Sequence, residues 1–234
     1  MQATLNSSED RWANQVYGML RARYGVLAWW PAESRFEIMV GAILTQNTAW
    51  TNVEKAIANL KSAGMLGAEA IVQAKQDLLA KLIRPSGYFN VKARRLRQFC
   101  LWYTRFGGYR KLRYWPTARL RQALLGVYGV GPETADDILL YAFNRPVFVI
   151  DAYTRRVFSR LGRIDGNEPY DEIREMFERQ LDRKPRVFGE FHALIVRHGK
   201  YVCQPQPKCA SCTLSPICRL GIERLHSRKS GFSL

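Results

Sequence analysis

Long hydrophobic runs are missing from this 234-residue sequence. No stretch approaches the roughly 18 apolar residues of a membrane-spanning helix, so we expect no contact with the membrane interior. Residues 1–11 are polar and mixed in charge, which does not fit a signal peptide. Internal repeats and low-complexity segments are also absent, and strand patterns are almost absent. These absences favour a globular protein of the cytoplasm.

Acidic residues are scarce relative to basic ones. The sequence has 20 Asp and Glu against 36 Lys and Arg, a formal net charge of +16. Such an excess favours a polyanionic partner: DNA, RNA or an anionic membrane surface. The positive charge is spread along the chain, for example over residues 92–97 and 105–113. Each cluster alone could be a solvated helix face, but the total agrees with a nucleic-acid partner.

Cysteines are few, and four of the five stand close together. Disulfides are rare in the cytosol, so the cysteines are expected to be ligands or free thiols. The spacing C-x5-C-x2-C-x5-C indicates a metal site formed by Cys203, Cys209, Cys212 and Cys218. Zinc usually takes two close pairs, whereas a single close pair is compatible with an iron–sulfur cluster. Spacing alone leaves both open. The fifth, Cys100, is expected to be a core residue.

Apolar residues recur with helical spacing along most of the chain, which predicts an all-α fold. One apolar run, Pro146–Ile150, is ambiguous between strand and helix, and residues 223–234 are expected to form a loose tail. Helices are predicted at residues 10–23, 35–44, 51–61, 68–74, 77–82, 90–106, 116–125, directly after Pro132, and at 152–161, 170–181 and 186–200.

The central stretch, residues 124–156, is a helix, a tight turn and a second helix, followed by a carboxylate. The turn is Gly129-Val130-Gly131, and Pro132 opens the second helix. Unpaired N–H groups at such a helix start suit a phosphate, although glycine-turned helix pairs are common and can be purely structural. After the apolar run comes Asp151, which is either an N-cap or a functional carboxylate.

This stretch resembles the helix-hairpin-helix signature of the endonuclease III superfamily of DNA glycosylases, L-x-G-V-G-x-x-T-A followed by an essential Asp. The resemblance implies that Asp151 is the catalytic acid and that the turn, Gly129 to Gly131, binds DNA. It also implies that Gln46 fills the gap left by an extruded nucleotide and that Tyr88 is a wedge opposite the lesion. Glu133 stands where bifunctional members keep a nucleophilic Lys, and a Glu cannot form a Schiff base.

The same resemblance suggests the domain organisation and the cofactor. Residues 35–144 would form a six-helix domain, and residues 1–34 and 145–222 a second helical domain, with DNA bound in the cleft between them. The superfamily's 4Fe–4S motif is C-x6-C-x2-C-x5-C after His-Gly-Arg/Lys-Tyr; here the first gap is one residue shorter. The resemblance implies that the four cysteines hold a structural 4Fe–4S cluster. We expect a nucleoid-associated monomer that binds damaged double-stranded DNA.

A closer resemblance is to the type III 3-methyladenine DNA glycosylases, through W-W-P, L-T-Q-N-T plus an aromatic, the R-P-S-G-Y-F-N turn and E-T-A-D-x-I-L-x-Y-A. It implies that Trp29 and Trp50 sandwich the flipped base and that Trp30 and Pro31 complete the pocket. Glu133 would orient Asp151 or contact the pocket, or be merely solvated. The best-known type of that group lacks the cysteines found here.

The function predicted from these resemblances is a monofunctional glycosylase for alkylated purines. The alternatives are a mismatch thymine or uracil glycosylase and a non-catalytic DNA-structure-binding protein.

Overall fold

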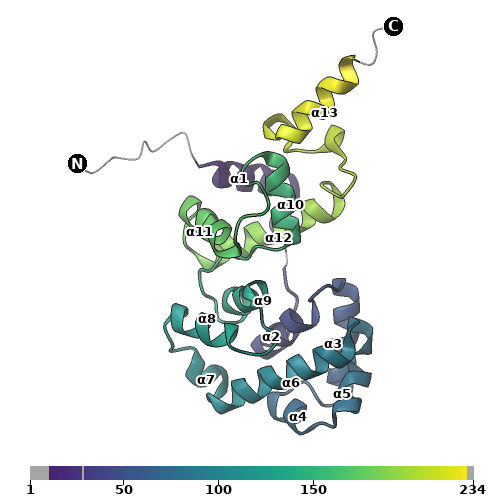
Figure 1. The fold of residues 1–234 in the computed structure, drawn as a ribbon, viewed down its shortest axis with the longest axis vertical. Coiled ribbons are helices and arrows are strands. Elements are labelled where there is room, and N and C mark those ends of the chain that lie inside the picture. Colours follow the sequence, from purple (N-terminus) through teal and green to yellow (C-terminus); the bar gives the residue numbers. More distant parts are fainter. Residues whose placement is uncertain (1–10, 28, 231–234) are drawn as a thin grey trace, which may run out of the picture. The chain divides into compact units, whose positions relative to one another are not determined.

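The computed structural model describes residues 11–27 and 29–230, with side chains described up to residue 224. In these residues all regular structure is helical, so the predicted all-α class is confirmed. None of the described helices is long and apolar enough to cross a membrane. The chain divides into two compact units, one of residues 30–145 and one of residues 1–29 with 146–234 (Figure 1).

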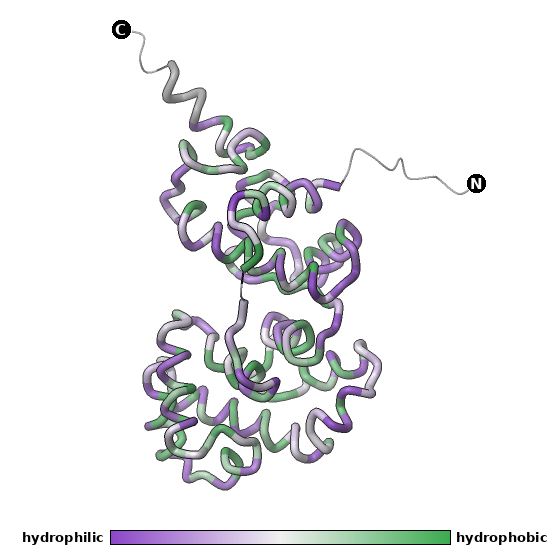
Figure 2. The backbone as a smooth tube through the Cα atoms, turned by 180° about the vertical axis from the view of Figure 1, so that it is seen from behind, coloured by the Kyte–Doolittle hydropathy of each residue, from purple (hydrophilic) through white to green (hydrophobic). Residues whose placement is uncertain are grey.

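The unit of residues 30–145 is built around one long helix. That helix, α6, packs against α2, α4, α5 and α7, and it buries Leu96 and Phe99 completely. Hydrophobic and hydrophilic segments alternate along the coils, as amphipathic helices require (Figure 2). The elements are α2 (Arg35–Leu44), α3 (Trp50–Ser62), α4 (Ala68–Gln73), α5 (Gln76–Leu82), η1 (Arg84–Ser86), α6 (Phe89–Arg105), α7 (Gly108–Leu112), α8 (Thr117–Leu125), α9 (Pro132–Asp137) and the π-helical turn η2 (Ile138–Ala142).

Helix α7 was not predicted from the sequence. Residues 105–113 were interpreted there only as a basic cluster. Gly107 and Gly108 take left-handed φ values of 78° and 61°, which ends α6 and lets the chain start a new five-residue helix. The basic residues of the cluster therefore lie at the end of α6 (Arg105), within α7 (Arg110 and Lys111) and directly after α7 (Arg113).

The other unit has an aromatic core. Phe148 stacks on Phe177 with ring centroids 4.7 Å apart, and Phe158 meets Phe177 edge-on at 4.6 Å. Helix α1 packs on α11 and α12, and α12 also packs on α10. The elements are α1 (Trp12–Tyr24), α10 (Ala152–Leu161), α11 (Tyr170–Gln180), α12 (Pro185–Tyr201), η3 (Cys209–Ser211), η4 (Ser215–Ile217) and α13 (Arg219–Ser230). The predicted start of the first helix at residue 10 lies outside the described residues.

The ambiguous run Pro146–Ile150 is extended and buried, but it pairs with no strand in the described chain. Side chains satisfy its backbone instead. Glu178 accepts a hydrogen bond from the Phe148 N–H (3.1 Å), and the Tyr170 hydroxyl accepts one from the Ile150 N–H (3.2 Å). Buried amides need such partners, which explains how an apolar segment with strand-like residues remains a single extended lead into Asp151.

The predicted loose tail is wrong over the part that the structure describes. Helix α13 runs from Arg219 to Ser230, so residues 223–230 are helical, while 231–234 lie outside the described residues. The helix is polar, and its first turn follows directly on Cys218. Sequence composition indicated solvent exposure there, but exposure does not exclude a helix.

Candidate active site

Asp151 stands at the junction of the extended run and α10, and its two carboxylate oxygens have different partners. Oδ1 accepts hydrogen bonds from the Thr154 N–H (2.7 Å) and the Thr154 hydroxyl (2.8 Å). Asp151 is thus the N-cap of α10, one of the two roles considered from the sequence. Oδ2 lies 3.6 Å from Nε2 of His192, and the Asp151 side chain keeps 12% of its surface exposed. The cap therefore occupies only one oxygen.

The electrostatics of this carboxylate favour the charged form. Burial by itself raises the pKa of Asp151, but the contact with His192 and the two Thr154 donors outweigh burial and hold that pKa below its ordinary value. Asp151 is accordingly a carboxylate at neutral pH. A partly exposed anion whose second oxygen is not used for capping can stabilise a developing positive charge beside it.

The hairpin is the turn between α8 and α9. Gly129 has φ +81°, a left-handed value suited to glycine, whereas Gly131 has φ −90°. Val130 is buried and anchors the turn. The two helices are fastened by a bidentate ion pair: Arg121 Nε and Nη2 donate to the fully buried Asp136 at 2.7 and 3.1 Å. The turn is thus a rigid loop on a clamped helix pair.

Gln46, which the sequence assigns to the duplex, is bound to this hairpin. Its Nε2 donates to the Gly129 carbonyl (3.0 Å) and to Thr134 Oγ1 (2.9 Å), and its Oε1 accepts a hydrogen bond from Arg95. Both the nitrogen and the oxygen of the Gln46 amide therefore have hydrogen-bond partners, and the side chain is half-buried. Entry of Gln46 into a duplex would require these bonds to break.

Tyr88, the predicted wedge, is 72% exposed. It follows Gly87 and takes a left-handed φ of 46°. Non-glycine residues with positive φ are uncommon and cluster at functional sites. In the described chain they are Trp30, Asn47, Tyr88 and Asn144. Three of these are, or directly follow, residues that the sequence assigns to the pocket or to DNA.

A buried lysine connects the turns that carry Gln46 and Tyr88. Lys92 is 1% exposed, and its ammonium donates to the Leu44 carbonyl (2.8 Å), to Thr48 Oγ1 (2.6 Å) and to the Ser86 carbonyl (2.7 Å). Burial, together with the charge of Arg95, lowers the pKa of Lys92 to about 8. The residue was not assigned a role from the sequence, because one Lys within a basic amphipathic helix has no distinctive pattern.

Three aromatic rings of one unit gather over α2. Trp30 meets Trp50 edge-on with centroids 5.4 Å apart and lies 4.9 Å from the ring of Tyr141. A Cβ at Gly41 would come within 3.3 Å of Trp30 Nε1 and 3.5 Å of Trp50, so the glycine permits both indoles to rest on the helix backbone. Trp30 Nε1 is buried and has no hydrogen-bond partner in the described structure.

The remaining predicted pocket residues are placed differently. Trp29 belongs to the other unit, where its ring meets His192 edge-on with centroids 6.2 Å apart. Pro31 is exposed, and Glu133 is exposed in the first turn of α9. The ring that the structure brings against Trp50 is thus Trp30, while the sandwich of Trp29 and Trp50 stays a prediction.

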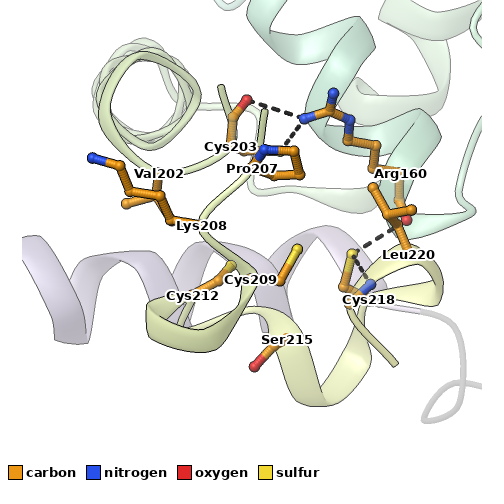
Figure 3. A pocket seen from close by; sticks show the side chains of 11 residues that line it. Arg160, Val202, Cys203, Pro207, Lys208, Cys209, Cys212, Ser215, Cys218 and Leu220 are labelled. Atoms are coloured by element: carbon orange, nitrogen blue, oxygen red, sulfur yellow. Dashed lines mark hydrogen bonds between the residues drawn. The ribbon is translucent and has the colours of Figure 1, made fainter. Parts of the chain in front are cut away.

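The four cysteines line one pocket, between the end of α12 and the start of α13 (Figure 3). Arg160 from α10 borders it, donating to the carbonyls of Gln204 (2.5 Å) and Pro205 (2.9 Å) and approaching Cys203 Sγ at 3.4 Å. His198 Nε2 lies 3.5 Å from Cys212 Sγ. The loop is therefore held by side chains that reach it from neighbouring helices.

The thiol chemistry of the pocket depends on burial. Burial raises the pKa of Cys212 to about 11 and also raises the pKa of Cys218. A metal or cluster requires thiolates, so its binding would release protons. Within the described residues, no three His, Cys, Asp or Glu side chains are grouped as a single ion would need. The cysteine site and its occupant stay a prediction.

Comparisons with known proteins agree with this fold. Residues 40–183 match the HhH-GPD superfamily of base excision DNA repair proteins. The chain is 46% identical over 207 residues to a protein of Methanocaldococcus jannaschii named as a DNA repair glycosylase, a match that covers 87% of this chain and 94% of that protein.

Solved structures add two further similarities. One is the H. pylori 3-methyladenine DNA glycosylase MagIII bound to 1,N6-ethenoadenine, with a TM-score of 0.71, 29% identity, and coverage of 80% of this chain and 97% of that one. Endonuclease III in a non-covalent complex with DNA shares the fold, with a TM-score of 0.78, 22% identity, and coverage of 92% and 98%. The chain therefore belongs to the HhH-GPD superfamily of base excision repair DNA glycosylases, the endonuclease III superfamily that its motifs resemble.

Proposed function

We propose that this glycosylase removes alkylated purines, chiefly 3-methyladenine, from duplex DNA by hydrolysis of the N-glycosidic bond, without strand cleavage. The observation that supports alkylated purines as the substrate is the group of three aromatic rings, Trp30, Trp50 and Tyr141, next to Gly41 of α2. An N3-methylated adenine is flat and cationic, and aromatic faces attract it by stacking and by cation–π forces. The 29% identity to MagIII supports the same class.

The aromatic group must open to hold a base. Trp30 and Trp50 touch edge-on at an interplanar angle of 66°, which leaves no slot between them. A base enters when one indole turns aside, and the half-buried position of Trp50 permits that movement. The buried Nε1 of Trp30, which lacks a partner in the described residues, then offers a hydrogen-bond donor to the base.

Once the base is flipped out of the duplex, hydrolysis of the N-glycosidic bond requires few catalytic groups from the protein. A cationic purine is already a good leaving group, so acid catalysis is dispensable. What remains is a carboxylate that stabilises the positive charge developing on the sugar and guides a water. Asp151 has the required charge and one oxygen outside its N-cap hydrogen bonds. Glu133 cannot act as a Schiff-base nucleophile, so we expect no lyase activity from that position.

A panel of duplexes with one lesion each tests this proposal. We expect free 3-methyladenine and an intact abasic strand that breaks only after alkali, with no DNA adduct trapped by borohydride. Release of thymine or uracil from mismatches, with alkylated purines untouched, would favour the mismatch glycosylase. Binding of every duplex without release of any base would favour the non-catalytic alternative.

We further propose that Cys203, Cys209, Cys212 and Cys218 hold a 4Fe–4S cluster. The four side chains border one pocket, and Arg160 can neutralise thiolate charge there (Figure 3). When bound, the cluster supplies a structural crosslink for the loop before α13. Purified protein should be brown, with broad visible absorption that is bleached by acid. Colourless protein with one equivalent of zinc would overturn the cluster.

A further inference from the structure

A buried lysine that the proposed reaction does not use joins three segments of the unit of residues 30–145. Lys92 lies on α6 and is 1% exposed. Its ammonium donates to the carbonyl of Leu44, the last residue of α2, and to the carbonyl of Ser86, the last residue of η1, at 2.8 and 2.7 Å. The third acceptor is Thr48 Oγ1, in the turn before α3, at 2.6 Å. Three donated hydrogen bonds use every N–H of a protonated lysine.

Thr48 ties the same segments together directly. Its hydroxyl accepts the hydrogen bond from Lys92 and donates to the Ser86 carbonyl at 2.5 Å. We call these four residues, Leu44, Thr48, Ser86 and Lys92, the Lys92 junction. The acceptors of the ammonium are two carbonyls and a hydroxyl, none of which carries a charge, and burial of a cation on such terms is costly. What Lys92 supplies is therefore a fixed spacing between the turn before α3 and the end of η1.

The two joined turns carry exposed residues with left-handed backbone. Asn47 has φ 52° and directly precedes Thr48, and Tyr88 has φ 46° and stands two residues after Ser86. Such conformations of non-glycine residues cost energy and persist where the surrounding structure holds them. Tyr88 is 72% exposed, so its own ring provides little of that support. The junction thus holds an exposed aromatic ring in a conformation that a free loop would rarely keep.

The surroundings of Tyr88 suit a polyanion. Residues 78–132 contain no Asp or Glu and 12 Lys and Arg. Among these cations, Arg84 and Arg94 are exposed and lie within six residues of Tyr88 on either side. Cationic side chains bind phosphates, and an exposed ring among them can stack on a base.

We propose that Lys92 and Thr48 are positioning residues for duplex opening, holding the turn of Tyr88 and the turn of Asn47 as one rigid element that inserts the Tyr88 ring into the base stack. A turn that is ordered before DNA binds avoids the entropic cost of ordering it on insertion. The inference rests on the proposed glycosylase function, which requires a base to leave the stack, and it adds the residues that assist this step.

A matched set of threonine variants tests the junction. Thr48→Val replaces the hydroxyl by a methyl group, and Thr48→Ser keeps the hydroxyl. Thr104→Val is the control, because the Thr104 hydroxyl bonds only carbonyls of its own helix, α6. Thr48→Val should lower single-turnover excision about tenfold, the value of one hydrogen bond to a charged group, while the other two variants stay within about twofold of the wild type.

Two further comparisons separate positioning from packing. The loss in Thr48→Val should appear when the target base is in a normal pair and nearly vanish when it stands opposite an abasic site, where opening costs less. In a double-mutant cycle, Thr48→Val should add almost nothing to the loss caused by Tyr88→Ala, because Thr48 acts through that ring. Equal losses on both duplexes, or additive losses in the cycle, would overturn the proposal.

Opening is also measured without excision, by the fluorescence of 2-aminopurine in a duplex, which rises when the base leaves the stack. At saturating protein, the wild type and Thr48→Ser should raise the fluorescence, and Thr48→Val and Lys92→Met should raise it less. If melting temperatures show that Lys92→Met is unfolded, Thr48→Val decides. Failure to release alkylated purines would remove the proposed function and leave this readout intact, whereas equal fluorescence with Thr48→Val and the wild type would remove the role of the Lys92 junction.

Discussion

A single side chain, Asp151, is the N-cap of α10 in the structure, and its second oxygen is the one to which we assign the proposed catalytic role. One oxygen caps α10 through Thr154, and the other faces His192. Sequence reasoning weighed an N-cap against a catalytic carboxylate because it assigns one role to one residue. The structure shows that a carboxylate can cap with one oxygen and keep the other available.

The charge of Asp151 should make folding stability depend on pH. Because its folded-state pKa lies below the ordinary value of about 3.9, the carboxylate stabilises the fold above that value and loses this contribution as pH falls through the folded pKa. The free energy of unfolding should therefore drop more steeply for the wild type than for Asp151→Asn between pH 5 and pH 3, measured by urea denaturation. An equal drop in both proteins would show that Asp151 is not coupled to folding.

Residue identity was easier to predict than residue environment. Asp151, Gln46 and Tyr88 were selected by motif, yet the sequence did not show that the Gln46 amide is bound by Arg95, Gly129 and Thr134. His192 and Lys92 were missed because a lone His or Lys in a helix has no local pattern. Their environments depend on contacts between distant parts of the sequence. His192 and Asp151 are 41 positions apart, and Lys92 is 48 positions from Leu44 and 44 from Thr48.

At the scale of elements, helical periodicity located most helices because each has a clear apolar face. Helical periodicity is less informative for segments whose structure depends on backbone conformation. Helix α7 depends on two left-handed glycines. The apolar spacing of Ala135, Ile138, Leu139 and Ala142 did predict a helix after Pro132, but not that its last part, η2, is π-helical. The extended run before Asp151 also escaped assignment, since side chains rather than a strand satisfy its amides.

The hairpin turn offers a matched pair of glycine substitutions. Gly129 has φ +81°, and an added Cβ would lie 2.3 Å from Arg95 Cγ, whereas at Gly131 an added Cβ meets nothing within 4 Å. Gly129→Ala should lower the free energy of unfolding by about 1–2 kcal/mol and disturb the Arg95–Gln46 bond. Gly131→Ala should change it by less than about 0.5 kcal/mol. Chemical denaturation measures both, and equal effects would contradict this account of the turn.

For the molecule as a whole, the net charge of +16 agrees with a protein that binds the DNA backbone. Affinity for duplex DNA should fall steeply with salt, by about a thousandfold between 50 and 200 mM if some six phosphates are neutralised. It should depend little on base sequence, since phosphate contacts do not read bases. Fluorescence anisotropy titrations on several sequences would show this. Tight binding to one sequence that is insensitive to salt would contradict it.

The most direct test of the catalytic account is single-turnover excision of 3-methyladenine by the wild type and by Asp151→Asn, with melting temperatures of both. Asparagine caps a helix as well as aspartate does, so thermal stability near neutral pH should fall only by the contribution of the Asp151 charge. The negative charge is lost at the transition state, so the rate should fall by about three orders of magnitude or more, while binding of lesion DNA persists. Near-normal excision by Asp151→Asn, with or without a stability loss, would show that Asp151 is only the cap of α10.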